Sequence, residues 1–296
     1  MLPRARQTQS FQFQSYSVSR MCKKNTARQP AHSTNRISAI LWYNNVMFPD
    51  LIDVGFLHLK TYGACMATGF LLCWCLIEKL SGRKDLSNLL VALMVGGVLG
   101  SRIAYVIEHW QKEFAARPLD VIRIDQGGLM FYGGFILAVV VFFTWCWLKK
   151  ENPLSLSDLF STVVPLGHAF GRIGCFFYGC CYGRDSDAWC AVTFPAGSPS
   201  WYEHGRQLVS VLPTQLFEAA ALLLLFAVLI TIYRKYRRYT TGIYFIGYAI
   251  IRFGIEYLRG DPRAAVGPFS ISQAISIGML LAGVVFVYFS VRRRSA

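Results

Sequence analysis

The chain has 296 residues, of which 54% are hydrophobic and only 16% are charged, whereas an average soluble domain carries about 25% charged residues, so the composition excludes an ordinary soluble protein. The aromatic content of 15% excludes intrinsic disorder over most of the length. The net charge of +14 comes largely from short basic clusters beside apolar runs. That is the pattern of membrane topology and not of a nucleic-acid-binding face, so we expect a multi-span membrane protein with no nucleic-acid partner.

The first 46 residues differ from the rest of the chain. They are polar and basic, and their one apolar patch, residues 37–43, is too short and poorly flanked for a signal peptide. We expect residues 1–46 to be a disordered or spurious N-terminal extension, with Met47 the true initiator. Residues 47–296 are then a single membrane domain.

Seven later stretches approach the length of about 20 mostly apolar residues that a membrane-crossing helix needs. If they alternate in direction, the basic clusters at 83–84, 149–150, 234–238 and 292–294 share one side, which the positive-inside rule makes cytoplasmic. The sequence therefore predicts an all-α membrane protein, a seven-transmembrane-helix bundle with its N-terminus outside and its C-terminus inside. Loops 108–126 and 180–212 are expected to form a small periplasmic cap. The predicted spans are 62–80, 89–107, 129–148, 159–178, 216–233, 242–258 and 270–291.

Three arginines lie inside these spans or at their margins: Arg102, Arg172 and Arg252. Each costs about 2.5–3.5 kcal/mol at the centre of a membrane helix, so each needs a partner or a polar cavity. Arg172 is flanked by Gly171 and Gly174, which permit a ligand or another helix to approach the backbone closely.

The sixth span places Tyr248, Arg252, Glu256 and Arg259 on one helical face. Two interpretations are open: an ion-paired stripe that joins helices, or a site for an anionic headgroup. Guanidinium groups suit the second, because they are always charged and bind phosphate with two donors at once. A phospholipid phosphate at the outer leaflet is the ligand that this chemistry favours.

A glycine-rich segment, residues 127–134, opens the third predicted span. Gly133 and Gly134 permit tight helix packing, and Tyr132 is suited to the membrane interface. Judged on physical grounds alone, helix packing with an interfacial aromatic residue is the favoured interpretation of this segment.

Residues 171–183, GRIGCFFYGCCYG, together with four other segments, resemble the signatures of the prolipoprotein diacylglyceryl transferase family. Those segments are 127–134, 213–218, the Gly100–Tyr105 element, and the stripe of the sixth span. The likeness runs in order from about residue 48 to residue 292. It implies an integral enzyme of the bacterial inner (plasma) membrane that moves the diacylglyceryl group of phosphatidylglycerol onto the lipobox cysteine of a pre-lipoprotein. The products are a thioether-linked lipid and glycerol phosphate, and no cofactor is implied.

The resemblance also implies site residues by position. Arg172 and Arg252 match the essential arginines of the family, with Tyr248 beside them. Further positions match functional or substrate-binding ones: Tyr62, Arg102, Gly133, Gly134, Gly183, Glu256 and Arg259. The sequence departs from the family where Tyr132 stands in place of a histidine often proposed as the base. It departs again where Cys175, Gly179 and Cys180 replace the asparagines and glutamate of the usual signature.

We expect Arg172 and Arg252 to hold the lipid phosphate and to stabilise the charge that develops on the leaving glycerol phosphate. The acceptor thiol must lose its proton before it attacks, because the thiolate is the nucleophile. Two candidates for the proton acceptor stay open. Tyr132 stands at the histidine position, and His168 lies four residues before Arg172 on the same helical face.

Four cysteines, Cys175, Cys180, Cys181 and Cys190, follow one another near the end of the fourth span, and two of them could form a disulfide in an oxidising compartment. No His-x-x-x-His or paired Cys-x-x-Cys spacing supports a zinc site, so no metal is expected.

Two rival classes of membrane protein are disfavoured. A light-driven protein would carry a retinal-binding lysine in the last span, and that span has no lysine. A transporter would more often show internal repeats, and the sequence shows none. A lipid-binding or lipid-modifying paralogue with a different acceptor stays open as the alternative.

Overall fold

The structure is a computed structural model that describes residues 50–54, 57–115, 117–123, 128–261, 265–266 and 268–292. The expectation for residues 1–46 lies outside this part of the chain. The chain divides into two compact units. One contains Gly96–Leu137 and is called the small unit here; the other contains Ser33–Val95 and Ala138–Ala296 and is called the main unit.

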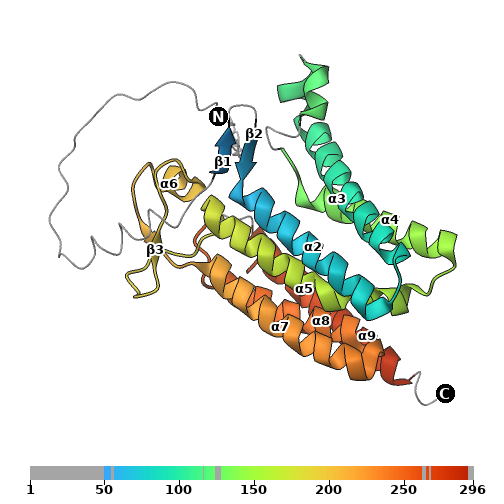
Figure 1. The fold of residues 1–296 in the computed structure, drawn as a ribbon. Helices are drawn as coiled ribbons and strands as arrows, with labels where there is room; N and C mark the ends of the chain where they lie inside the picture. The colour runs from blue at the N-terminus through green and yellow to red at the C-terminus, as the bar shows by residue number, and fades with distance from the viewer. Residues whose placement is uncertain are drawn as a thin grey trace, which may run out of the picture. The chain divides into compact units, whose positions relative to one another are not determined.

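Every predicted span corresponds to one long α-helix in the described residues (Figure 1). Five stretches are long and apolar enough to cross a membrane: Thr61–Ser81, Asp85–Phe114, Phe131–Lys149, Thr214–Glu256 and Ile271–Arg292. The prediction of an all-α membrane protein is therefore supported. The long helices are α2 (Thr61–Ser81), α3 (Asp85–His109), α4 (Phe131–Lys149), α5 (Pro153–Tyr178), α7 (Thr214–Tyr236), α8 (Thr240–Glu256) and α9 (Ile271–Arg292).

The remaining elements are short. Three two-stranded antiparallel pairs are β1 (Asp50–Val54) with β2 (Leu57–Lys60), β3 (Val192–Thr193) with β4 (Ser210–Val211), and β5 (Ala265–Val266) with β6 (Phe269–Ser270). The short helices are η1 (Trp110–Phe114), η2 (Pro118–Ile122), α6 (Pro199–Glu203) and η4 (Arg237–Tyr239), the last of which separates α7 from α8.

Helix α5 is the centre of the main unit. It packs against α2, α7 and α8, and α8 in turn packs against α9 (Figure 1). The Asn152 side chain caps its start by accepting hydrogen bonds from the backbone N–H groups of Leu154 and Ser155, and Gly179 ends it in the left-handed conformation. Because its neighbours are other helices, α5 buries polar residues that a lipid-facing helix could not.

One such residue is Asp158, which joins α5 to α8. Its Oδ1 atom accepts hydrogen bonds from the backbone N and the hydroxyl of Thr241, at 2.8 and 2.7 Å. The backbone N–H at the start of α8 is thereby satisfied in a buried position. On the other side of α5, Leu159 and Val163 pack with Ile77 of α2 in the main apolar core.

The segment between α5 and α7 contains β3, α6 and β4 and is called the cap here. Its apolar cluster contains Phe176, Tyr182, Val192, Phe194 and Val211. The Tyr182 hydroxyl donates a hydrogen bond to the Glu203 carboxylate. The cap therefore has an apolar centre of its own, next to the end of α5.

Within the small unit, glycines bring α3 and α4 into direct backbone contact. A Cβ atom placed on Gly133 would lie 2.4 Å from the carbonyl oxygen of Gly100, and one on Gly134 would lie 2.6 Å from that of Gly97. No side chain fits at either position. The packing interpretation of the glycine-rich segment is therefore confirmed.

Candidate functional site

A buried ion pair between α5 and α7 forms the first part of the site. Arg172 Nη2 lies 3.0 Å from Glu218 Oε1, and only 1% of the Glu218 side chain is exposed. The Nε of Arg172 and the Oε1 of Gln215 are buried and have no hydrogen-bond partner within the described residues. Buried polar groups are normally satisfied, so these two atoms are available to a polar ligand.

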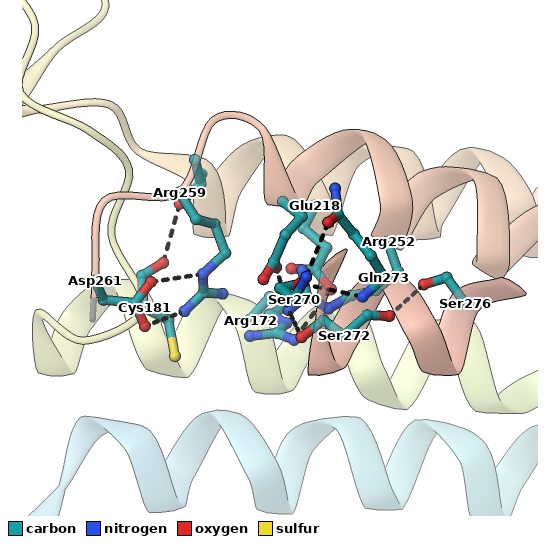
Figure 2. A network of polar contacts seen from close by, with 12 residues as sticks. Arg172, Cys181, Glu218, Arg252, Arg259, Asp261, Ser270, Ser272, Gln273 and Ser276 are labelled. Carbon is teal, nitrogen blue, oxygen red and sulfur yellow. Dashed lines mark hydrogen bonds and ion pairs between the residues drawn. The ribbon is translucent and has the colours of Figure 1, made fainter. Parts of the chain in front are cut away.

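Arg252 of α8 forms the second part (Figure 2). Its Nη2 donates to Ser272 Oγ at 2.7 Å and lies 2.8 Å from Glu256 Oε2. Ser272 is held in place at the start of α9 by a capping box, in which Ser270 and Gln273 exchange backbone and side-chain hydrogen bonds. The guanidinium therefore has one acidic and one hydroxyl contact on two different helices.

His168 and Tyr248 lie near both arginines. Both side chains are within electrostatic range of Arg172 and of Arg252. The imidazole lies 5.2 Å from the Tyr248 ring, centroid to centroid, and His168 Nε2 is 3.9 Å from Glu218 Oε1. The structure thus brings together four of the five residues predicted to be catalytic.

The prediction that Arg259 continues the helical face of Tyr248, Arg252 and Glu256 is wrong. Helix α8 ends at Glu256, and Arg259 instead forms a β-bridge with Gly183 of the cap. The Arg259 guanidinium makes a bidentate ion pair with Asp261, in which Nε donates to Oδ1 at 2.8 Å and Nη2 donates to Oδ2 at 2.7 Å. The end of the helix redirects the chain, so Arg259 faces the cap and not the groups around Arg252.

Gly183 is required at this bridge by close packing. A Cβ atom there would lie 2.7 Å from the Leu258 carbonyl oxygen and 2.8 Å from that of Leu212. Gly183 therefore joins the cap to the chain after α8, and the contacts that it makes there are packing contacts.

Three thiols lie beside Arg259. The Sγ atoms of Cys175, Cys180 and Cys181 are all within 4.8 Å of one another, and all three cysteines are free. Hydrogen bonds from the other two thiols, and then the Arg259 guanidinium, hold the pKa of the Cys181 thiol below its usual range. Tyr62, at the start of α2, is within electrostatic range of the same three thiols and of Arg172.

The remaining predicted site residues belong to the small unit. Arg102 donates to the backbone carbonyls of Asp120, Val121, Arg123 and Gly128, at 2.7, 2.8, 3.0 and 3.2 Å. These contacts use the guanidinium to hold η2 and the chain after it, so they favour a structural role over the predicted substrate-binding one.

Tyr132 and its two glycine neighbours open α4, and the Tyr132 side chain is exposed. The backbone contacts of Gly133 and Gly134 described above account for both glycines. The structure therefore supports packing at these positions and supplies no contact that would favour substrate binding.

Glu218 is a site residue whose role the sequence did not predict. It lies in segment 213–218, which resembles a family signature. A carboxylate in an otherwise apolar stretch was the available signal, because a charge inside a span needs a partner. Only the packing of α5 on α7 identifies that partner as Arg172.

A family model and several individual proteins similar to this chain all carry the same description. A family model described as prolipoprotein diacylglyceryl transferase matches residues 49–289. A phosphatidylglycerol–prolipoprotein diacylglyceryl transferase of Pseudoalteromonas translucida (strain TAC 125) is 33% identical over 252 residues, which cover 80% of this chain and 91% of that protein. The like-named protein of Azospirillum brasilense is 32% identical, with 84% and 96% covered. One from Clostridium perfringens (strain 13 / Type A) is 34% identical, with 77% and 90% covered.

The Arg172–Glu218 pair generates a prediction on stability. Glu218→Ala leaves a buried guanidinium without its carboxylate, so the free energy of unfolding in detergent should fall by about 3–5 kcal/mol. Glu218→Gln retains an oxygen acceptor and should lose less. Glu151→Ala removes a partly exposed partner of Arg83 and should cost at most about 1 kcal/mol. Equal unfolding midpoints for Glu218→Ala and Glu151→Ala would contradict the assignment.

Proposed function

Because this chain belongs to the prolipoprotein diacylglyceryl transferase family, we propose that the site around Arg172 and Arg252 is where it transfers a diacylglyceryl group from phosphatidylglycerol to a prolipoprotein. The chain is a transferase of lipoprotein biosynthesis. Its acceptor is the lipobox cysteine of the pre-lipoprotein signal peptide. The thiol sulfur attacks the diacylglycerol carbon that carries the phosphate ester, the carbon–oxygen bond breaks, and glycerol phosphate leaves.

The observation that carries this proposal is the pair of arginines Arg172 and Arg252, whose side chains are only 15% and 9% exposed and each lie against a carboxylate. The phosphodiester of the substrate has one negative charge, whereas the leaving phosphate monoester gains a second one as the bond breaks. Arg172 and Arg252 therefore interact more strongly with the transition state than with the bound lipid, which is the condition for catalysis. Glu218 and Glu256 hold the two guanidinium groups in place and offset their charge before the substrate binds.

The acceptor thiol gives its proton to a base before or during the attack. His168 is the candidate that the contacts support, since it lies beside Tyr248 and Glu218 and within electrostatic range of both arginines. Tyr248 interacts with Arg172 from α8 and positions that guanidinium.

The transfer is tested with purified protein in phosphatidylglycerol-containing membranes and a lipobox peptide, with peptide mass and released glycerol phosphate as readouts. The wild-type protein should add one diacylglyceryl group per peptide. Arg172→Ala and Arg252→Ala should each lower turnover by about 10²–10³-fold, the usual loss when a donor to a developing oxyanion is removed. Arg172→Lys retains the charge but not the planar fork and should also be impaired.

Arg83→Ala is the matched control. Arg83 also pairs with carboxylates, those of Asp85 and Glu151. It lies just after the C-terminal end of α2, whereas Tyr62 lies at the N-terminal end of that helix. It should transfer at the wild-type rate. If phosphatidylglycerol binds but no lipobox peptide gains mass, the transfer to a lipobox cysteine is refuted, and the protein is a paralogue that only binds lipid or uses a different acceptor.

The assignment of the base makes a separate prediction. His168→Gln should lower the maximal turnover by about 10²–10⁴-fold, the range for loss of a general base, while phosphatidylglycerol binding changes little. Tyr132→Phe should leave turnover close to wild type. Full turnover in His168→Gln, or a large loss of turnover in Tyr132→Phe, would show that His168 is not the base.

We also propose that all seven long helices cross the inner (plasma) membrane of a bacterium, with the N-terminus outside and the C-terminus in the cytoplasm. Helix α5 counts as a span because its polar residues face other helices, and η4 divides Thr214–Glu256 into two spans. The basic residues near the ends of α2, α4, α7 and α9 set the orientation.

Reporter fusions test this topology. A fusion after Arg292 should report the cytoplasm, and fusions after Glu151 and after Asp185 should report opposite sides. If the last two fusions report the same side, α5 does not span; if Arg292 reports the outside, the orientation is reversed.

A further inference from the structure

The cluster of Cys175, Cys180 and Cys181 has no part in the transfer reaction described above. Its three Sγ atoms lie within 4.8 Å of one another, and each side chain is partly buried. Cys175 lies in the last turn of α5, which ends at Tyr178, and the other two follow Gly179 in the turn beyond the helix. Three sulfur donors thus converge on one point at the junction of the main helix and the cap.

The turn that carries the thiols is held by contacts on both sides. Gly179 and Cys181 both have left-handed backbone conformations, with φ angles of 77° and 63°, which reverse the chain so that the second and third thiols return toward Cys175. From α7, Gln215 Nε2 donates to the Cys180 carbonyl at 2.7 Å, and the Thr214 hydroxyl donates to the Cys181 carbonyl at 3.0 Å. The arrangement of the sulfurs is therefore preorganised by the fold.

The electrostatic surroundings favour a negatively charged group here. The Arg259 guanidinium is within electrostatic range of the Cys181 thiol, and it pairs with Asp261 (Figure 2). Arg172 also lies within electrostatic range of Cys175 and Cys181. Two guanidinium groups can therefore compensate the charge of several thiolates at once.

Thiolates are soft ligands that select Cu(I) and Zn(II). Metal–sulfur bonds of about 2.3 Å would place three equivalent sulfurs about 4 Å apart, which is within the observed limit of 4.8 Å. Zinc almost always takes four ligands in structural sites, but no fourth His, Cys, Asp or Glu joins the group among the described residues. Cu(I) is complete with three thiolates.

We propose that Cys175, Cys180 and Cys181 bind one Cu(I) ion in a three-coordinate, all-thiolate site. Binding replaces three S–H protons by one monovalent cation, so the complex carries two negative charges, beside Arg259 and Arg172. The bound ion joins the end of α5 to the turn that leads into the Gly183–Arg259 bridge. This site does not depend on the proposed transferase activity.

The test uses the full-length protein in detergent, reduced and kept free of oxygen, with Cu(I) supplied as the only metal and excess removed by a competing Cu(I) chelator. One copper should remain per chain, and X-ray absorption should give three sulfur neighbours at about 2.3 Å. Cys175→Ser, Cys180→Ser and Cys181→Ser should each reduce the retained copper at least about tenfold, which corresponds to about 1.4 kcal/mol. Cys190→Ser, in the same cap but outside the trio, should retain it.

A second measurement does not require the variants to fold. Copper should protect three thiols of the wild-type protein from alkylation, identified by peptide mass as the trio, while Cys75 and Cys190 react as before. The proposal is overturned if the reduced protein retains no copper, or if the three serine variants retain as much as wild type. A disulfide within the trio that forms under reducing conditions would overturn it as well.

Discussion

The need to neutralise arginine inside an apolar bundle is the constraint on which the rest of the structure depends. A buried guanidinium is tolerated only where a carboxylate and further hydrogen bonds compensate it. Arg172 meets this condition through Glu218 of α7, and Arg252 meets it through Glu256 and Ser272. Arg172 also keeps a buried Nε atom without a hydrogen-bond partner among the described residues, so the same interactions that permit burial also prepare a site for a phosphate.

This constraint explains why the helices are arranged around α5. A helix that carries His168 and Arg172 cannot face lipid, and it becomes the central element against which α2, α7 and α8 pack. Close packing of α8 on α9 then decides what Arg252 meets. A Cβ atom on Gly242 would lie 3.0 Å from the carbonyl oxygen of Gly283, and toward the other end of α8 the arginine donates to Ser272 at the start of α9. Small residues at helix contacts take the place of a hydrophobic driving force, which is weak within a membrane.

The cap depends on the same logic at its junction with the helices. Gly183 and Arg259 are bridged, Arg259 is paired with Asp261, and three thiols converge beside that guanidinium. A short segment with a small apolar cluster of its own gains its position from these polar contacts. The site and the cap are thus linked through the chain that runs from Arg252 to Asp261.

Much of this architecture follows from the sequence. Long apolar runs and basic flanks determined the seven helices, since their length and periodicity reflect local chemistry, and the isolated charges of Arg172 and Arg252 indicated the site. Tertiary structure decided the rest. It ended α8 at Glu256 and turned Arg259 toward the cap, it paired Arg172 with a carboxylate 46 positions further along the chain, and it used Arg102 to hold a loop. It also gathered three cysteines whose spacing matches no common metal motif. These outcomes depend on which helices touch and how the chain reverses between them, and a sequence expresses such contacts only through the packing of distant residues.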